Sequence, residues 1–558
     1  IDDGSCILGN CVENITQNTF TADIQSGIDA SVNGDTLIAS SGSYTENITI
    51  NGKNIVLASD FLLSGDTSYI SSTIIDGNQN GNVFVFQNAE IVISGFTVQN
   101  GIDWIGNGGG GFYINDCNDI KIYNCEIKDC SAPSNTSSTG GGAIFSNNSD
   151  ILVENIKVFN CSTNSRGGGI HTRNQSDITI NNSQIYNNSS SDDGSAFYHY
   201  GNAGVLRILK TKIFSNTGGN TIRIEGDSLI LENSLFYSNN SYLGADDATI
   251  HTDVSGLKIL NSTISNNTHG VTLLGTIKGV VLNSIIHNNY NYDFHVDLNF
   301  SNPLVLSSSD FYTINNNLGL VTTNANNYFN GTIPTSYPIS WINNIDIDPN
   351  YLDSLNGDYS LSNFSACIGA GLDTSIIPIT DLDGNLRPNP AGSNPDMGAY
   401  ENLLAIPDVL GCTDPTSLVY NPNANINDPS LCCYIGGCID PAATNYDPLA
   451  CFNTISCNFL VNNITQDTGY AVIQTAIDSS INGDTIIVSS GTYTENINFN
   501  GKGVVLASDF LLTGDTSFIS STIIDGNNNG RVVTFFDNLY TPQLIGFTIQ
   551  NGFANQPP

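Results

Sequence analysis

Short stretches in which apolar and polar residues alternate recur along most of the chain, and their period of two predicts β-strands. Between residues 91 and 290 one motif returns eight times, as ISGFTVQNG, IYNCEIKDC, VENIKVFNC, INNSQIYNN, ILKTKIFSN, LENSLFYSN, ILNSTISNN and VLNSIIHNN. We call its third residue the anchor. The residue two positions before the anchor is always aliphatic, and the residue three positions after it is always apolar. Many of these residues are β-branched, which favours strands that bury one face.

The spacing of the anchors predicts a stack of coils. Anchors fall at positions 95, 124, 155, 182, 210, 233, 261 and 283, so neighbours lie 22 to 31 residues apart. A constant motif at variable spacing indicates one coil of fixed geometry with loops of different length. A coil this short cannot bury its apolar face alone, so each coil must stack on its neighbours.

Two columns rich in asparagine predict the turns of this stack. Five positions after the anchors stand Asn100, Asp129, Asn160, Asn187, Ser215, Ser238, Asn266 and Asn288. Six positions after them stand Gly101, Cys130, Cys161, Asn188, Asn216, Asn239, Asn267 and Asn289. Asparagine tolerates the left-handed backbone and bonds to local main chain, which a stack of identical bends requires.

The second column places Cys130 over Cys161 on adjacent coils. Neighbouring strands lie about 4.8 Å apart, and that separation falls within the Cα range of disulfides. We therefore predict that these two cysteines form either a disulfide or a ladder of thiols.

A short helix is predicted ahead of the first strands. Ile24, Ile28 and Val32 fall on one helical face, and Asn33 followed by Gly34 ends the helix. The segment ADIQSGIDASVNGDTLIASSGSYTENITINGKNIVLAS resembles the N-terminal cap and first coils of the pectate-lyase-like families. The resemblance implies an all-β fold, a right-handed parallel β-helix or solenoid with a short N-terminal capping helix.

Glycine runs before two strands carry a second resemblance. GGGAI occupies residues 140–144 and GGGI occupies residues 167–170. These runs are similar to the GGAI-type repeats of bacterial secreted and surface β-helix adhesins and autotransporters. They lack the lysine and the following helix of a phosphate-binding loop, so nucleotide binding is excluded.

The end of the chain repeats its beginning. Residues 463–535 match residues 14–86 at a constant offset, with about seven positions in ten identical. A match of this quality exceeds compositional chance and is typical of tandem repetition. We infer that the chain is a window of a longer tandem array.

Residues 406–460 differ from the rest and hold six of the 13 cysteines. GCTDPTSLVYNPNANINDPSLC and GCIDPAATNYDPLAC are imperfect copies, similar to the GCTDP…NY…DDGSC-like repeats of large secreted proteins of environmental bacteria. The opening IDDGSCILGNC looks like the tail of such a module. These likenesses imply four segments: the tail of a preceding connector at 1–13, a β-helix at 14–405, a Cys-rich connector at 406–460, and the start of a second β-helix at 461–558.

Cysteines this dense, with little apolar sequence around them, predict a module stapled by disulfides in an oxidising compartment. Zinc is the rival interpretation, but the module has no paired CxxC motif and no histidine. By their shared position in each half, we expect Cys412 to pair with Cys432 and Cys438 with Cys451, although sequence alone leaves other connectivities open. The protein is therefore expected to be extracellular or at the cell surface.

Charge excludes several classes of partner. The chain has 52 acidic and 15 basic residues, a formal net charge of -37. Nucleic acids and anionic membrane surfaces are excluded because both require clustered Lys and Arg. No apolar run approaches the ~20 residues of a membrane span, and no leader opens the chain, so we expect no membrane insertion in this segment and any targeting signal outside it.

Residues for an enzyme acting on an extracellular glycan are few. A lyase needs a base beside a carboxylate, and a hydrolase needs a carboxylate pair. Five residues on two neighbouring coils could share a face, namely His171, Arg173, Asp192, Asp193 and His199. The simpler interpretation is that they are loop residues on a polar surface, so no catalytic residue is assigned.

Two weaker groupings have the same simple interpretation. Asp246 and Asp247 followed by His251 form a second polar cluster. An aromatic track for neutral glycans could consist of Trp104, Tyr113, Tyr198 and Tyr200, although such residues more often cover the edges of coils.

Residues 343–371 and 381–401 resemble the sequences that close secreted β-helix domains. A structural polar cluster around the last coil is expected from Asp381, Asp383, Arg387, Asp396 and Glu401. The sharper alternative is a calcium site held by Asp381 and Asp383. Calcium is the one cofactor that the sequence brings into consideration.

Three functions compete at this stage. The leading hypothesis is an extracellular structural or adhesive protein, in which rigid rods contact copies of themselves or neighbouring repeats in a fibre. If residues 35–400 form about fourteen coils of ~4.8 Å, one rod is roughly 70 Å long. The alternatives are a polysaccharide lyase or glycoside hydrolase, and a glycan- or calcium-binding module without turnover.

Overall fold

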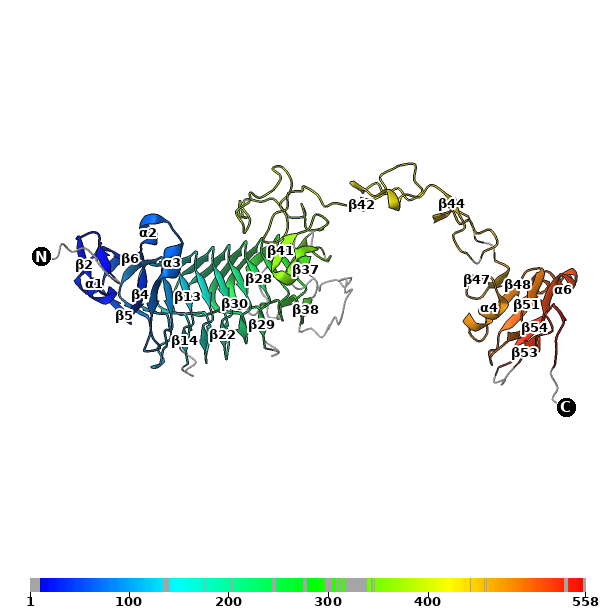
Figure 1. Cartoon of the computed structure of the whole chain (residues 1–558), viewed down its shortest axis with the longest axis horizontal. Coiled ribbons are helices and arrows are strands. Elements are labelled where there is room, and N and C mark those ends of the chain that lie inside the picture. The colour runs from blue at the N-terminus through cyan, green and yellow to red at the C-terminus, as the bar shows by residue number, and fades with distance from the viewer. Residues whose placement is uncertain are drawn as a thin grey trace. The chain divides into compact units, whose positions relative to one another are not determined.

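The chain folds into two compact units, Ile1–Pro407 and Asp408–Pro558. Figure 1 shows the first unit, from blue to green, as stacked coils of strands. The computed structural model describes residues 11–133, 140–174, 176–201, 204–242, 247–273, 278–296, 304–307, 310–311, 314–316, 339–342, 345, 347–441, 443–455, 457, 459–535 and 540–554.

The middle coils of the first unit contribute strands to three sheets. One coil consists of β15 (Ile144–Asn147), β16 (Ile151–Glu154), β17 (Lys157–Phe159) and β18 (Ser162–Thr163). The next coil repeats it as β19 (Ile170–Arg173), β20 (Ile178–Asn181), β21 (Gln184–Tyr186) and β22 (Ser189–Ser190). Every strand pairs in parallel with its counterpart in the next coil. The predicted all-β solenoid of parallel strands is confirmed.

The three sheets run along the stack. Sheet A has 23 strands and includes both the β15 and β16 positions of each coil. Sheet C has five strands, β14 (Ser131–Ala132), β18, β22, β26 (Thr217–Gly218) and β29 (Asn240–Ser241). Sheet B has eleven, which are β4 (Gly42–Thr45), β7 (Thr73–Asp76), β10 (Thr97–Gln99), β13 (Glu126–Lys128), β17, β21, β25 (Lys212–Phe214), β28 (Leu235–Tyr237), β31 (Thr263–Ser265), β34 (Ile285–His287) and β37 (Asp310–Phe311).

Side chains that point inward form the core of the coils. In sheet A one inward column stacks Phe84, Phe112, Ile144, Ile170, Phe197 and Ile222 in register. All of them are fully buried in a single hydrophobic cluster that extends through the coils. Successive residues of a strand face opposite sides of the sheet. The residue that follows each of these inward residues in its strand therefore points away from the core.

The asparagine columns form the turns that the sequence predicts. All eight residues five positions after the anchors have left-handed backbone, with φ between 53° and 61°. The residues one position later point inward and form a buried ladder. The Asn188 side-chain amide donates to Oδ1 of Asn216 (3.1 Å), and the series ends where Asn289 donates to Oδ1 of Asp293 (2.7 Å).

Cys130 and Cys161 precede this ladder in the same column. Both are free, buried thiols, and their side chains contact each other. Of the two predicted alternatives, the structure therefore contains the ladder of thiols. The backbone N–H of Cys161 continues the column by donating to Oδ1 of Asn188 (3.0 Å).

The predicted capping helix is α1 (Ile24–Ala30), which follows the hairpin of β1 (Val12–Asn14) and β2 (Thr19–Thr21). Asp23 caps its first turn by accepting from the backbone N–H of Ser26 (2.7 Å). Ile24 and Ile28 are buried as expected, but Val32 is 59% exposed. The prediction for Val32 is wrong because the helix ends in the extended backbone of Ser31, which removes Val32 from the helical phase.

Residues 347–405, which we call the flank segment, turn back along the outside of sheet B. The segment contains β40 (Tyr351–Asp353), a 3₁₀ turn (Ser354–Asn356) and β41 (Asp358–Leu361). The Lys210 ammonium donates to Oγ1 of Thr380 (2.9 Å), and the backbone N–H of Ala399 donates to Oγ1 of Thr263 (3.0 Å). The estimate of about fourteen coils is wrong because this segment does not continue the stack; the eleven strands of sheet B span about 50 Å.

Three disulfides staple the connector in the second unit. They are Cys412–Cys432, Cys433–Cys451 and Cys438–Cys457. The predicted Cys412–Cys432 bond is confirmed, whereas the prediction that Cys438 pairs with Cys451 is wrong. Cys438 and Cys457 are 19 residues apart and match the 20-residue separation of Cys412 and Cys432, so Cys457 is the equivalent partner. Cys451 instead joins the two halves through Cys433.

After the connector the opening of the first unit is repeated. β46 (Val461–Asn463), β47 (Thr468–Tyr470) and α4 (Ile473–Ser479) form the same hairpin and helix. Parallel strands follow, beginning with β48 (Thr485–Val488), β49 (Gly491–Thr494), β51 (Val505–Ser508) and β52 (Thr522–Asp525). A helical pair recurs too, as α2 (Phe61–Ser64) with α3 (Ser68–Ser72) and as α5 (Phe510–Thr513) with α6 (Ser517–Ser521).

Candidate functional site

The outward residues of sheet A form the first candidate site. His171 lies in β19 between Phe145 of the preceding coil and Tyr198 of the next. Its ring meets both neighbours edge to face, with centroids 5.2 Å from Phe145 and 5.0 Å from Tyr198. Although this column points away from the core, all three residues are at least 97% buried.

Glycine loops cover this outward column. A Cβ at Gly167 would lie 2.6 Å from Cβ of His171, and one at Gly194 would lie 2.6 Å from Cβ of Tyr198. Both glycines have left-handed backbone, with φ of 71° and 70°. The glycine runs of the sequence therefore let the chain cross closely over the side chains of sheet A, since any other residue would clash there.

Burial makes His171 a poor acid–base group. Desolvation, followed by the charges of Arg173 and Arg166, lowers the pKa of His171 to about 3. Its Nδ1 atom has no hydrogen-bond partner within the described residues. The imidazole is therefore neutral over the physiological pH range, and the covering loop separates it from solvent.

His199 lies on the opposite side of the sheet from His171. It pairs in register with Thr172, so it occupies the inward column, and its Nδ1 lies 2.8 Å from Oγ1 of Thr172. Burial lowers the pKa of His199 to about 4. The structure thus separates the two histidines, since residues 171 and 172 face opposite sides of β19 and His199 stacks on the second of them. Arg173 lies beyond Thr172, in register with Tyr200.

Asp192 and Asp193 lie beside a cation that sequence reasoning missed. Nε of Arg166 pairs with Oδ2 of Asp192 (2.9 Å), and NH1 of Arg166 donates to the Tyr198 hydroxyl (2.7 Å). The Asn220 amide donates to Oδ1 of Asp193 (2.6 Å). Arg166 precedes Gly167 as Asp193 precedes Gly194, so an alignment of the glycine runs could have placed Arg166 one coil before Asp193.

We call Arg166, Asp192, Asp193, Tyr198 and Asn220 the loop cluster. Burial raises the pKa of Asp193, and it raises the pKa of Tyr198 to about 12. Tyr198 therefore stays protonated, and the guanidinium of Arg166 is already engaged by Asp192 and Tyr198. The cluster joins two neighbouring loops through ion-pair and hydrogen-bond contacts.

The weaker groupings do not assemble a site in the described part of the chain. His251 lies in the same outward column as His171, in register with Arg223, and the backbone carbonyl of Asp247 accepts from the Tyr292 hydroxyl (2.7 Å). Asp246 lies outside the described residues. The four aromatic residues form no continuous exposed track. Tyr113 and Tyr198 lie in one outward column with Phe145 and His171 between them, and Tyr198 is buried, whereas Trp104 and Tyr200 are exposed.

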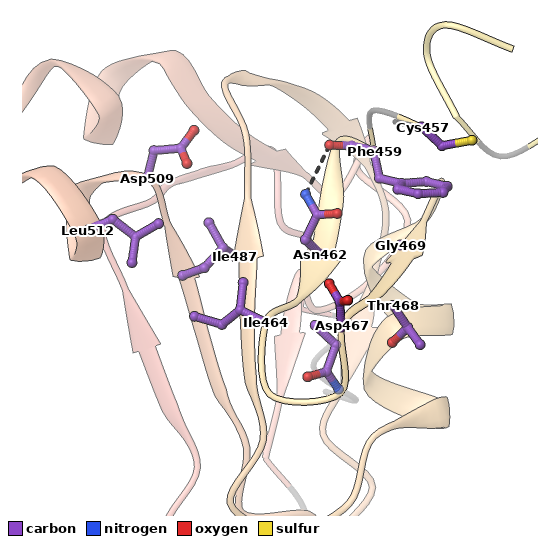
Figure 2. A pocket seen from close by; sticks show the side chains of 11 residues that line it. Cys457, Phe459, Asn462, Ile464, Asp467, Thr468, Gly469, Ile487, Asp509 and Leu512 are labelled. Carbon is purple, nitrogen blue, oxygen red and sulfur yellow. Dashed lines mark hydrogen bonds between the residues drawn. The ribbon is translucent and has the colours of Figure 1, made fainter. Parts of the chain in front are cut away.

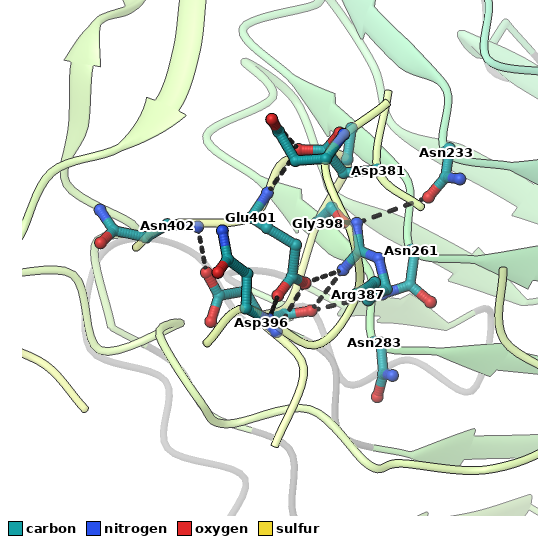
Figure 3. A network of polar contacts seen from close by, with 12 residues as sticks. Asn233, Asn261, Asn283, Asp381, Arg387, Asp396, Gly398, Glu401 and Asn402 are labelled. Carbon is teal, nitrogen blue, oxygen red and sulfur yellow. Dashed lines mark hydrogen bonds and ion pairs between the residues drawn. The ribbon is translucent and has the colours of Figure 1, made fainter. Parts of the chain in front are cut away.

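The polar network of the flank segment, shown in Figure 3, is the second candidate site. NH1 of Arg387 pairs with Oε1 of Glu401 and donates to the carbonyl of Asp396 (3.0 Å). NH2 of Arg387 donates to Oδ1 of Asn233 (3.4 Å), an anchor residue of the β-helix. Neither side chain of the ion pair is exposed. The network therefore fastens the flank segment to the side of the coils rather than surrounding the last coil, which corrects the sequence expectation.

Burial, followed by the charge of Glu401, raises the pKa of Asp396 in this network to about 7. Two backbone N–H groups donate to its carboxylate, from Gly369 (2.7 Å) and Asn402 (2.6 Å). Burial also raises the pKa of Glu401 and lowers the pKa of Arg387. Asp396, Glu401 and Arg387 all contact other protein groups, so we interpret the network as one that holds the flank segment in place.

The calcium candidates do not fit a cation. The Asp381 carboxylate accepts from the backbone N–H groups of Asp383, Asn385 and Glu401 and from the Asn385 side chain. N–H groups directed at both oxygens occupy the positions that Ca²⁺ would take. The Asp383 side chain is exposed instead of joining the network. Among the described residues no group of three or more His, Cys, Asp or Glu side chains is arranged to hold a metal.

A pocket of about 320 Å³ in the second unit is the third candidate site (Figure 2). The Phe459 ring lies against Gly469, where a Cβ would come within 1.9 Å of it. By the internal repeat, Gly469 corresponds to Phe20 of the first copy. The connector thus supplies an aromatic ring where the cap lacks one. The described lining residues include no Lys, Arg or His, so the pocket lacks a cationic group for acidic glycans.

Comparison with known proteins identifies the coil region. Residues 59–219 match the family model described as "Right handed beta helix region". No curated protein matches the chain. None of the helices in the described part of the chain combines the length and apolar character of a membrane span.

Two solved structures of polysaccharide lyases resemble the chain. The crystal structure of pectate lyase Pel9A matches at 14% identity with a TM-score of 0.34, over 68% of this chain and 90% of that one. The PL6 family alginate lyase AlyGC matches at 11% identity with a TM-score of 0.33, over 94% of this chain and 70% of that one. Likenesses at this level carry nothing about catalysis in this chain.

Proposed function

We propose that the chain is part of an extracellular structural protein, in which rigid β-helix rods alternate with disulfide-stapled connectors and contact copies of themselves in a fibre. In this proposal no catalytic role is assigned to the described residues of the rods. The three connector disulfides support an oxidising compartment. The fold alone does not fix this role, since one fold is shared by proteins of many functions.

The duplicated cap is the observation that carries this proposal. The Asn14 amide donates to Oδ2 of Asp35 (2.8 Å), and the Asn463 amide donates to Oδ2 of Asp484 at the same distance. Glu46 accepts from the first two N–H groups of α1, and Glu495 does the same for α4. The second copy thus repeats the hydrogen bonds that hold the cap together in the first copy. Repetition of a rod adds reach, whereas a catalytic site is needed only once.

The interior of the rod favours a load-bearing role. Buried Asn188, Asn216, Asn239, Asn267 and Asn289 bond from coil to coil, in addition to the backbone bonds between parallel strands. Such a ladder ties each coil to the next at the turn, where the sheets are interrupted. A stack held in this way resists bending because every coil contacts its neighbours along its whole length.

The polar groups that an enzyme would use are committed to the fold. His171 and His199 are buried and neutral, and they lie on opposite faces of sheet A. Arg166 is held by Asp192 and Tyr198. General acid–base catalysis requires a group of suitable pKa within reach of the substrate, and these residues are arranged instead to support the loops.

A depolymerisation assay tests the proposal. The native protein is incubated with polygalacturonate and alginate, with and without Ca²⁺, while unsaturated products and reducing ends are followed. We expect no products above those of the heat-denatured protein. Products that form with the wild type and are lost in Arg166→Met and Asp193→Asn, both still folded by circular dichroism, would overturn the proposal in favour of an enzyme.

A further inference from the structure

Two of the buried thiols are arranged differently from the others. The described residues include five cysteines that form no disulfide, Cys117, Cys125, Cys130, Cys161 and Cys367, all of them buried. Cys130 and Cys161 occupy the same position of adjacent coils, and their side chains contact each other. Cys125 stacks on Ile156 in the next coil, because these two residues follow the anchors Asn124 and Asn155.

The pairing of strands on both sides fixes Cys130 over Cys161. Before the turn, Ile127 pairs with Val158 in sheet B; after it, Ser131 pairs with Ser162 in sheet C. The backbone N–H of Ser162 donates to the carbonyl of Cys130 (3.0 Å). Residues stacked in this way lie about 4.8 Å apart, inside the Cα range of about 4.4–6.8 Å in which disulfides form.

We propose that Cys130 and Cys161 are a site of oxidation, at which a disulfide between them staples two adjacent coils of the β-helix. The oxidant is a small-molecule disulfide such as oxidised glutathione. One thiol loses its proton, and its sulfur attacks the oxidant, forming a mixed disulfide and releasing one reduced glutathione. The second cysteine, also deprotonated, displaces the second glutathione. Two thiols are thereby oxidised, one glutathione disulfide is reduced, and the two protons pass to the released thiolates.

The column in which the cysteines lie explains why a bond is useful there. From Asn188 to Asn267 each amide donates both to a carbonyl of the preceding coil and to the next amide of the column, as Asn188 does to Val158 and Asn216. A thiol has a single weak donor and cannot continue this pattern. The Sγ–O distance from Cys161 to the Ile127 carbonyl is 3.9 Å. A disulfide replaces the missing hydrogen bonds between these two coils with a covalent one.

The reaction occurs before the turn is buried. Both cysteines are 1% exposed in the folded coil, so the oxidant reaches them while the coils are forming, in the compartment that oxidises the connector. Closing the bond requires the two Cβ atoms to approach by about 1 Å, from the strand spacing of about 4.8 Å to the mean separation of about 3.8 Å in disulfides, which a turn accommodates more readily than the middle of a strand.

Thiol mapping of the native protein tests the site. Protein is refolded in a glutathione buffer, unfolded without reductant, alkylated, digested and analysed by mass spectrometry. We expect Cys117, Cys125 and Cys367 to be alkylated and Cys130 and Cys161 to appear as one linked peptide pair, which a second sample treated with mild reductant releases. Full alkylation of all five cysteines, with the three connector bonds intact, would overturn the proposal.

Two serine variants provide the control. In Cys130→Ser the thiol of Cys161 should become alkylated in every molecule, whereas in Cys125→Ser the linked pair should persist unchanged. Both replace one buried thiol, at the turn before β13 in Cys125→Ser and at the turn after it in Cys130→Ser. The two variants therefore remove the same group and differ in whether it faces a second cysteine. A linked pair absent from Cys125→Ser as well as from Cys130→Ser would contradict a specific bond. The depolymerisation assay is unaffected by either outcome.

Discussion

Thr172 and His199 lie on neighbouring coils inside the β-helix, with Oγ1 of Thr172 and Nδ1 of His199 2.8 Å apart. His171, the residue before Thr172, points to the other side of the same strand and packs under a glycine loop. One position in the sequence thus separates an interior hydrogen bond from an outward stack of rings. The side of the strand that a polar residue faces therefore decides whether it bonds inside the coils or packs under a loop.

The buried histidine makes stability depend on pH. Burial lowers the pKa of His199 to about 4 in the folded protein, against an ordinary value of 6.5, so below pH 6.5 the unfolded chain binds more protons. The contribution of neutral His199 to the free energy of unfolding is fully present above pH 6.5 and is lost as the pH falls toward 4. The loss from this one group is about 2 kcal/mol at pH 5. In His199→Asn, denaturation midpoints should therefore fall less between pH 7 and pH 5 than in the wild type; parallel curves would contradict the assignment.

The interior amide ladder is expected to be sensitive to single substitutions. Asn239→Ala removes the donor to the Ile213 carbonyl (2.9 Å) and the acceptor for the Asn216 backbone N–H (3.1 Å), which leaves buried groups unpaired. The expected loss is about 2–3 kcal/mol in the free energy of unfolding. The exposed neighbour provides the control, since Asn240→Ala should change it by no more than about 0.5 kcal/mol. Equal effects in urea titrations would show that the ladder is not a source of stability.

Alanine substitutions at two glycines distinguish the cost of backbone strain from the cost of a steric clash. Both Gly34 and Gly167 have positive φ, of 93° and 71°, but a Cβ at Gly34 meets nothing within 4 Å whereas one at Gly167 lies 2.6 Å from His171. Gly34→Ala should cost about 1–2 kcal/mol. Gly167→Ala should cost more than that by at least about 1 kcal/mol, because the loop must also move. Thermal unfolding of the two variants checks the order, and a reversed order would refute the close crossing.

The sequence predicts repeated elements better than it predicts contacts between distant segments. Asparagine turns and parallel strands follow from a motif that returns on each coil, so the columns at Asn187 and Asn188 could be inferred directly. The flank segment could not, because the contact of Lys210 with Thr380 joins residues 170 apart without a shared pattern. The pairing of Cys438 failed for a related reason, since two halves of unequal length can be aligned on more than one cysteine.

The fastening of the flank segment is expected to depend on one arginine. Arg387→Met leaves Glu401 buried without its partner, which should cost about 3–5 kcal/mol and expose residues 365–402 to hydrogen exchange. Arg207→Met is the matched control, because Arg207 is paired with Asp177 at 3.6 Å on the surface. It should leave exchange in the segment unchanged. Unaltered protection in Arg387→Met would mean that the apolar contacts of Tyr359 and Leu382 suffice.

The most direct test of a structural role is electron microscopy of the native protein, negatively stained in buffers of low and high salt. If the protein is structural, the images should contain extended particles in which narrow rods alternate with thinner connectors, and filaments where copies associate. Fields of compact, separate particles under all of these conditions would contradict it.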